Sequence, residues 1–230
     1  TDTRKIYRKV TPTVNTYTFN GTSGWDFRSG TSGTITGGNV VCTGMGSGLA
    51  TANNNVHDLQ DELGSGNNAS ATAWVLRGKY KNSTTSNYVF FGLTSVDQTN
   101  PPNNSPQDYI GWSSYKSSSS DNGLDIRDNG SPDPSGKGNA SVNNTNWYWI
   151  EIVRDSSSAT LKLYTEANEF TGTPAFTDTE SIPSGVENLR YIKFGATHNG
   201  GGSAYLTDVK FYNGATSVES RNWIERNTAT

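Results

Sequence analysis

The chain has 230 residues, a length that suits one large β-sandwich or barrel without division into several domains. Only 31 % of the residues are apolar, but 11 % are aromatic, which argues against disorder because disordered chains are poor in aromatic residues. The net charge of -3 and the single basic run at Arg4–Lys9 argue against a nucleic-acid-binding protein, and no apolar run approaches the roughly 18 residues of a membrane span.

Short strand-like runs separated by Gly, Asn, Ser and Pro clusters predict an all-β chain with almost no helix. The predicted strands in the first part of the chain are Lys5–Val10, Thr16–Phe19, Gly24–Phe27, Gly33–Thr43, Val56–Leu63, Ala71–Tyr80, Asn87–Thr94, Asp108–Tyr115 and Gly123–Arg127. Those in the second part are Trp147–Arg154, Ala159–Thr165, Arg190–Thr197 and Ala204–Tyr212. Helical turns are expected only within Asn53–Leu63 and within Ser217–Asn227.

Trp147–Arg154 is the clearest single element. Tyr148, Ile150 and Ile152 alternate with Trp149 and its neighbours, so both faces carry apolar groups and the strand is predicted to be central in its sheet. The turn at Asp155–Ser158 predicts a hairpin with Ala159–Thr165.

Arg190–Gly214 contains two further alternating runs around the glycine-rich turn His198–Ser203, and we expect them to form a closing hairpin. Together with Trp147–Thr165, this closing pattern resembles the concanavalin A-like lectin and glucanase superfamily and its laminin G-like jelly rolls. Ala73–Arg77 and Tyr88–Leu93 resemble the strand pair that begins the main body of such domains.

The resemblance spans roughly Tyr17 to Gly214 and implies a two-sheet antiparallel jelly-roll sandwich. We therefore expect an N-terminal extension over residues 1–15, a jelly-roll domain over 16–214 and a C-terminal tail over 215–230. Within the extension, Lys5–Val10 could add as a strand to the sheet edge of another subunit, which would allow self-assembly through the terminal segments.

Catalysis is not expected. Glucanases of the resembling fold carry a Glu-x-Asp-x-x-Glu strand that supplies the two carboxyl groups of glycoside cleavage, and that pattern is absent from this chain. The two histidines, His57 and His198, accompany no serine in a nucleophile elbow.

A calcium site is a second expectation. Asp121–Asn129 gathers several oxygen ligands of the kind calcium prefers, although Asx-turns around a short strand would explain the same residues. The resemblance to laminin G-like domains implies one calcium at the sandwich rim. The candidate ligands are Asp97, Asp108, Asp121, Asp125 and Asp128.

Sugar binding needs an aromatic platform beside amides or acids that take the hydroxyl groups. Asp108, Tyr109 and Trp112 offer this combination between two polar loops, with Trp147 and Trp149 as alternates. Core packing is the competing explanation for each ring.

The sequence also indicates a secreted or surface-displayed protein. Seven Asn-x-Ser/Thr sites could carry glycans, although chance alone would supply a similar number in so Asn- and Ser-rich a chain. They are Asn20, Asn68, Asn82, Asn103, Asn129, Asn139 and Asn143. The chain begins at Thr1 rather than methionine, as expected of a processed protein. The single cysteine, Cys42, excludes an intramolecular disulfide.

Two functions are compatible with these observations. The first is an extracellular, non-catalytic recognition module that binds carbohydrate or another cell-surface ligand through edge loops. The second is a structural subunit of a filament, surface layer or virion that uses the jelly roll as a building block.

Overall fold

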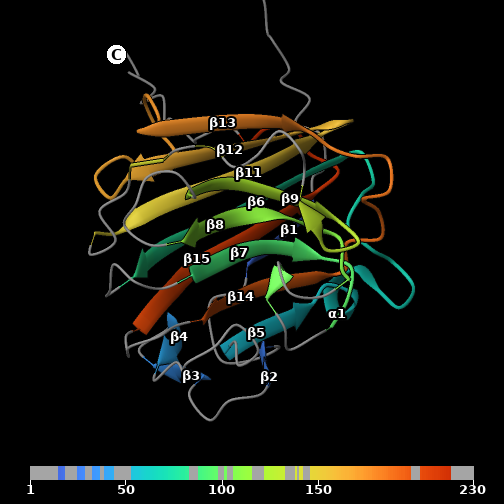
Figure 1. The fold of residues 1–230 in the computed structure, drawn as a ribbon, viewed down its shortest axis with the longest axis horizontal. Coiled ribbons are helices and arrows are strands. Elements are labelled where there is room, and N and C mark those ends of the chain that lie inside the picture. The colour runs from blue at the N-terminus through green and yellow to red at the C-terminus, as the bar shows by residue number, and fades with distance from the viewer. Residues whose placement is uncertain are drawn as a thin grey trace, which may run out of the picture.

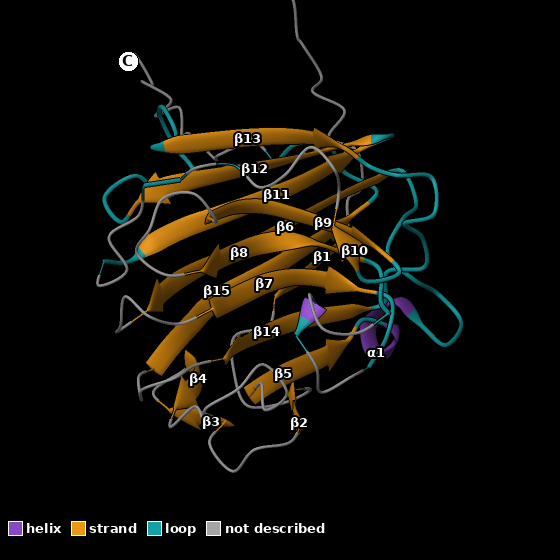
Figure 2. Cartoon of the chain, in the orientation of Figure 1, coloured by secondary structure: helices purple, strands orange, loops and turns teal. Residues whose placement is uncertain are grey.

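The fold consists of two antiparallel sheets. The structure, a computed structural model, describes residues 15–18, 25–28, 33–36, 39–43, 53–82, 88–97, 101–102, 106–115, 122–132, 138, 140–141, 146–197 and 203–218. Strands make up nearly all of the described elements (Figure 2). The predicted strand Lys5–Val10 and most of the predicted C-terminal helix lie outside these residues.

The first sheet has eight strands in the order β13-β12-β11-β6-β15-β4-β3, and β1 also pairs with β15. Its strands are β1 (Asn15–Thr18), β3 (Gly33–Thr36), β4 (Asn39–Thr43), β6 (Ala73–Asn82), β11 (Tyr148–Asp155), β12 (Ser158–Thr165), β13 (Phe176–Ser181) and β15 (Ser203–Asn213). The central strand β6 lies between β11 and β15.

The second sheet has seven strands in the order β10-β9-β8-β7-β14-β5-β2. Its strands are β2 (Trp25–Arg28), β5 (Asn53–Asp58), β7 (Tyr88–Thr94), β8 (Tyr109–Tyr115), β9 (Asn122–Asp128), β10 (Ser131–Pro132) and β14 (Tyr191–Thr197). The two sheets lie one over the other, so that β8 and β7 of the second sheet overlap the first sheet in the view of Figure 1.

One hydrophobic core fills the space between the sheets. Successive side chains of a strand point to opposite faces, so every second residue enters the core. The first sheet contributes Trp74, Leu76, Ile150, Ile152, Leu161, Leu163, Leu206 and Phe211, and the second contributes Val89, Phe91, Leu93, Ile110, Trp112, Leu124, Ile126, Ile192 and Phe194. The all-β sandwich expected from the sequence is confirmed.

The predicted hairpin β11–β12 is confirmed as well. Its strands pair from Tyr148 opposite Thr165 to Asp155 opposite Ser158. Ile150 and Ile152 are fully buried in the core, while Trp149 is on the outer face and is also nearly covered. The strand is therefore central, as its two apolar faces predicted.

Two predicted strand pairs are wrong. β14 and β15 do not form a closing hairpin, because β14 pairs with β5 and β7 in one sheet and β15 pairs with β6, β4 and β1 in the other. The glycine-rich segment between them joins two sheets. β6 and β7 are separated in the same way. Alternation alone identifies strands but carries no information about which sheet each one joins.

The alternation expected in β15 is interrupted by a β-bulge between Thr207 and Lys210. Asp208 has φ 53°, a left-handed conformation that Asp tolerates better than most residues do. Beyond the bulge, Val209 and Phe211 both enter the core. The bulge therefore allows one long strand to keep its apolar side chains inside along its whole length.

The predicted strand Val56–Leu63 is divided into the end of a strand and a short helix. The strand β5 ends at Asp58, whose carboxylate accepts a hydrogen bond from the Gln60 backbone N–H at 3.0 Å, and the one-turn helix α1 (Gln60–Leu63) follows. The strand β13 was not predicted. Its sequence, FTDTES, is polar because it forms the edge of its sheet and half of its residues are exposed.

Candidate functional site

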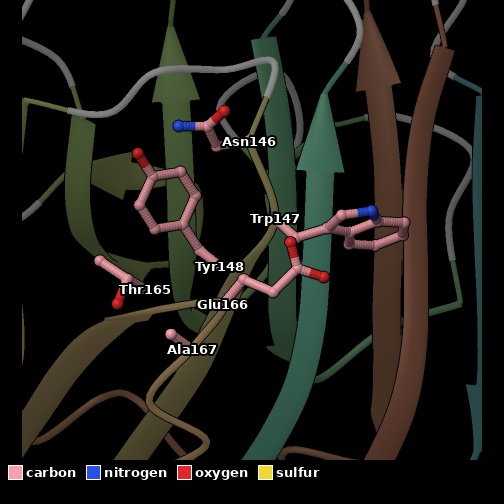
Figure 3. Close-up of a pocket in the computed structure, with 6 residues that line it drawn as sticks. All are labelled: Asn146, Trp147, Tyr148, Thr165, Glu166 and Ala167. Carbon is pink, nitrogen blue, oxygen red and sulfur yellow. The ribbon is translucent and has the colours of Figure 1, made fainter.

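A pocket of about 260 Å³ lies at the rim of the sandwich, where the β11–β12 ladder begins. Its lining consists of Asn146, Trp147, Tyr148, Thr165, Glu166 and Ala167 (Figure 3). Tyr148 and Thr165 are direct partners in the strand register and form the base of this group. The other four residues lie just before β11 and just after β12. We call this the rim pocket.

The turn after β12 is held in place by aromatic packing. The Trp149 indole Nε1–H donates a hydrogen bond to the Glu166 carbonyl oxygen at 3.1 Å. The Phe170 ring packs against Trp149 and Tyr164, with ring centroids 5.2 and 5.8 Å away. The pocket wall that carries Glu166 is therefore fixed by a cluster of rings beneath it, and we expect its side chains to be preorganised.

The rim pocket combines apolar rings with polar groups. Figure 3 shows the Asn146 amide beside the Tyr148 ring, and the Glu166 carboxylate between Tyr148 and the Trp147 indole. The Glu166 side chain is 57 % exposed, and its Oε1 accepts a hydrogen bond from Lys79 Nζ at 2.8 Å. Carboxylate, amide and hydroxyl groups around an aromatic wall can bind a polyhydroxylated ligand.

A strip of lysines and rings continues from the pocket across the outer face of the eight-stranded sheet. Lys79 and Lys81 extend from β6, with Trp149 of β11 opposite Lys79 and Tyr205 of β15 opposite Lys81. Lys79 Nζ lies 5.2 Å from the Trp147 ring centroid and 5.1 Å from that of Trp149, and Lys81 Nζ lies 5.9 Å from that of Trp147. We call these five residues the lysine–aromatic strip.

The predicted sugar-binding residues are not brought together. Trp147 lines the rim pocket and is partly exposed, while Trp149 lies largely covered below it. Asp108 is at the start of β8, in the other sheet, where its carboxylate accepts hydrogen bonds from the backbone N–H groups of Asn129 and Glu187. Asp108 therefore connects the turn between β9 and β10 to the segment between β13 and β14.

The prediction for Tyr109 and Trp112 is corrected. Both side chains are 0 % exposed. Trp112 lies in the core against Tyr80, with ring centroids 6.1 Å apart, and the Tyr109 hydroxyl donates to the Trp112 carbonyl oxygen. Neither ring has a face open to a ligand, so core packing explains both.

The predicted calcium ligands do not form a site among the described residues. Asp125 is buried, where its Oδ2 accepts hydrogen bonds from Arg127, Ser113 and Tyr88 at 3.1–3.3 Å. Asp97 is exposed, Asp128 is partly exposed, and Asp121 lies outside the described part of the chain. No group of three or more metal-binding side chains occurs within the described residues, and calcium binding stays a prediction.

Three of the predicted glycosylation sites can be placed. Asn129 is exposed at the turn between β9 and β10, and Asn68 is partly exposed. Asn82 is 0 % exposed in β6, so the folded domain has no room for a glycan there, and this prediction is corrected. Asn20, Asn103, Asn139 and Asn143 lie outside the described residues.

The outer face of the seven-stranded sheet holds a buried polar network. Gln107 Oε1 accepts hydrogen bonds from Thr94 Oγ1 at 2.8 Å and from Lys193 Nζ at 3.1 Å. Lys193 is 0 % exposed, and loss of hydration lowers the pKa of its ammonium group to about 7, despite the opposing charge of Asp97. Burial likewise raises the pKa of the nearby Tyr88 phenol well above its usual value.

Most residues of the rim pocket were not predicted from the sequence. Glu166 lies in the turn after β12, and nothing along the chain indicated that it meets Lys79, a residue of a different strand 87 positions away. The dipeptide Asn146-Trp147 beside a strong strand was a usable signal, because polar and aromatic residues at a strand end often line binding sites.

No protein-family model and no curated protein sequence matches the chain. Solved structures do match. Arcelin-5, a lectin-like defence protein from Phaseolus vulgaris, aligns with a TM-score of 0.58 and 14 % identity over 87 % of this chain and 98 % of its own. The winged bean acidic lectin, solved with methyl-α-D-galactose, gives 0.56 and 12 % identity over 87 % and 98 % of the two chains.

Lectin II from Ulex europaeus gives a TM-score of 0.54 and 11 % identity over 86 % of this chain and 97 % of its own. An alginate lyase, A1-II', also aligns, but its TM-score of 0.49 is too low to carry an argument. At these identities the likeness concerns the fold alone. The chain has the concanavalin A-like jelly-roll fold, which confirms the resemblance found in its sequence.

Proposed function

We propose that this protein is a non-catalytic carbohydrate-binding module, and that a sugar binds in the rim pocket. The observation that carries the proposal is the pocket itself. About 260 Å³ in volume, it is lined by Asn146, Trp147, Tyr148, Thr165 and Glu166, with the Tyr148 ring and the Trp147 indole directed to opposite sides of the strand and the Glu166 carboxylate between them. A sugar presents apolar C–H faces and a rim of hydroxyl groups, and this lining complements both.

The position of the pocket supports the same reading. The edges and ends of a sandwich are where ligands reach loops held by a rigid scaffold. Here the scaffold is the β11–β12 ladder, and the Phe170–Trp149 packing secures the turn that carries Glu166. The similar structures include lectins solved with methyl-α-D-galactose and with galactose, so the fold can present a sugar site.

The proposal excludes catalysis and places the module outside the cell. The non-catalytic part rests on the missing Glu-x-Asp-x-x-Glu strand and on the pairing of the central carboxylates. Glu151 is bound by Arg77 and Lys162, and Glu166 by Lys79. Asp178 accepts backbone hydrogen bonds. No helix in the described residues is long and apolar enough to cross a membrane.

Isothermal titration calorimetry against a panel of neutral and acidic oligosaccharides tests the proposal. We expect Trp147→Ala to weaken binding of the best ligand at least about tenfold, because it removes the ring that the sugar would contact. Glycan binding that is identical in the wild type and in Trp147→Ala would overturn the rim pocket as the site. Parallel titrations with calcium and with EDTA test the calcium expectation.

Tyr191→Ala is the matched control. Tyr191 is also a partly exposed ring on a strand, and the Arg190 guanidinium covers it at 4.8 Å, but it belongs to β14 of the other sheet. This variant should bind like the wild type. Circular dichroism of both variants checks that the fold is retained.

Sedimentation of the same preparations addresses the structural-subunit alternative. The segments on which that alternative depends, 1–14 and 219–230, lie outside the described residues. Binding of no glycan, together with assembly that is lost when residues 1–12 are removed, would replace the recognition module with a structural subunit.

A further inference from the structure

The outer face of the eight-stranded sheet carries a group of cations although the whole chain has a net charge of -3. The strands β6, β11, β12 and β15 present the cations Arg77, Lys79, Lys81, Lys162 and Lys210 on this face, together with the carboxylates of Glu151 and, at the far end of β11, Asp155, and the bulge of β15 carries Asp208. The turn after β12 adds Glu166 and Glu169. Of the cations, Lys79 and Lys81 lie beside Trp147 of the rim pocket.

Two carboxylates on this face, Glu151 and Glu166, already form ion pairs. Glu151 is buried and shared between Arg77, whose Nε donates at 2.7 Å, and Lys162, whose Nζ donates at 3.1 Å. This one carboxylate therefore forms ion pairs with two cations. Glu166 pairs with Lys79 in a largely exposed position, where an ion pair contributes little and can be exchanged for another partner.

Lys81 differs from Arg77, Lys79 and Lys162, each of which forms an ion pair with a carboxylate. Among the described residues no carboxylate forms an ion pair with it, and its one recorded partner is the Trp147 ring, 5.9 Å from Nζ. Trp147 and Tyr205 flank it, with ring centroids 6.2 Å apart. Their rings and the strand register fix the position of the lysine stem, so Lys81 places beside the rim pocket a positive charge that no carboxylate of the described residues pairs with.

Resting on the carbohydrate function proposed above, we propose that the ligand is an acidic polysaccharide. One sugar unit occupies the rim pocket, and the chain continues across β6 towards Tyr205, with a carboxylate or sulfate group of a neighbouring unit bound by Lys81. Trp147 belongs to both the pocket and the lysine–aromatic strip, so the two are continuous. A carboxylate or sulfate of the ligand supplies a counter-charge that the described residues do not give Lys81.

A nucleic acid fits this surface less well. Its bases could stack on the rings, but its phosphates would meet the Glu166 carboxylate at the pocket, where like charges repel. Sugar hydroxyl groups instead donate hydrogen bonds to a carboxylate. The combination of an acid in the pocket and the Lys81 cation beside it favours a ligand with hydroxyl groups and spaced negative charges.

Affinity electrophoresis in gels that contain sodium polygalacturonate tests the proposal, with fully methyl-esterified polygalacturonate as the neutral form of the same backbone. We expect the wild type to be retarded by the charged polymer at least about fivefold more strongly than by the ester, because the ester removes the partner of Lys81. Dextran sulfate, compared with dextran, distinguishes sulfate from carboxylate as the preferred acid.

Substitutions of single charged residues test which cation binds the acidic group of the polymer. Lys81→Gln should remove most of the preference for the charged polymer and leave the weaker retardation by the ester unchanged. Lys162→Gln is the matched control, because it makes the same change of charge on the same face, beside Glu151 and away from the rim pocket. A second variant, Glu166→Gln, should raise the ratio of charged-polymer to ester binding, because it removes a repulsive charge and frees Lys79.

The outcomes separate the two proposals. Equal binding of polygalacturonate and its ester, lost in Trp147→Ala, would overturn the acidic ligand and keep the carbohydrate module. Equal loss in Lys81→Gln and Lys162→Gln, or stronger retardation by polyadenylate than by any polysaccharide, would also overturn it, because a general attraction of the face for anions would then explain the binding. Retardation by none of the polysaccharides would overturn both.

Discussion

At the scale of single residues, Lys193 shows how burial changes the charge of a side chain. Its ammonium group is fully covered and meets Gln107 Oε1 at 3.1 Å, and burial lowers its pKa to about 7. In the unfolded chain the pKa of a lysine is about 10.4. Between these values the unfolded chain binds a proton that the folded chain has released. The free energy of unfolding should therefore rise with pH in this window.

We expect this rise to reach at most about 1.4 kcal/mol per pH unit between pH 7 and 9. Below pH 7 lysine is protonated in both states, so the unfavourable effect of burying the charge is fully present and no longer changes with pH. Urea unfolding at several pH values measures it. In Lys193→Met the rise should disappear, and in Lys210→Met, a partly exposed strand residue, it should persist. A rise of the same slope in Lys193→Met would contradict the assignment.

At the scale of elements, Asp178 joins the two sheets at their open edge. It lies on the edge strand β13, and its Oδ2 accepts hydrogen bonds from the backbone N–H groups of Leu124 at 3.1 Å and Gly138 at 3.0 Å. The approach is close: a Cβ on Gly123 would lie 2.6 Å from the Gly138 nitrogen. The edge of β13 is therefore held against β9 by one carboxylate.

Asp178→Ala should lower the free energy of unfolding by about 1–3 kcal/mol, because two backbone donors lose their acceptor. It should also speed hydrogen exchange at the Leu124 N–H. Glu180→Ala is the control: Glu180 is two residues further along the same strand, and its side chain forms no hydrogen bond with the described residues. If both variants lose the same stability, the role given to Asp178 is wrong.

The same elements show what the sequence could predict. Trp147–Thr165 was predicted correctly because its partners are local and its alternation is strong. The partners of β14 and β15 were not, since pairing across more than a hundred residues leaves no local pattern. Trp112 was misassigned because an aromatic residue between polar loops has the same sequence signature whether its ring faces the core or the solvent. Lys81 was missed because its importance depends on Trp147 and Tyr205, which the register brings from other strands.

At the scale of the whole molecule, both sheets share one core. Side chains from β6, β11, β12 and β15 interlock with those from β7, β8, β9 and β14 in a single cluster. Neither sheet can lose its packing without exposing the inner face of the other. Differential scanning calorimetry should therefore show one cooperative transition, with calorimetric and van't Hoff enthalpies in agreement. Two resolved transitions would mean that the sheets unfold separately.

The topology also has a consequence for the order in which the chain can fold. β7, β8, β9 and β10 pair in sequence, as do β11, β12 and β13, so these two meanders can form as soon as they are synthesised. β6 must wait for β15, and β5 for β14. Until residues 203–213 are available, one flank of β6 stays an open edge, able to pair with another chain. β15 is thus the strand that closes the larger sheet, and a nascent chain that has not yet released residues 203–213 exposes this edge of β6 to aggregation.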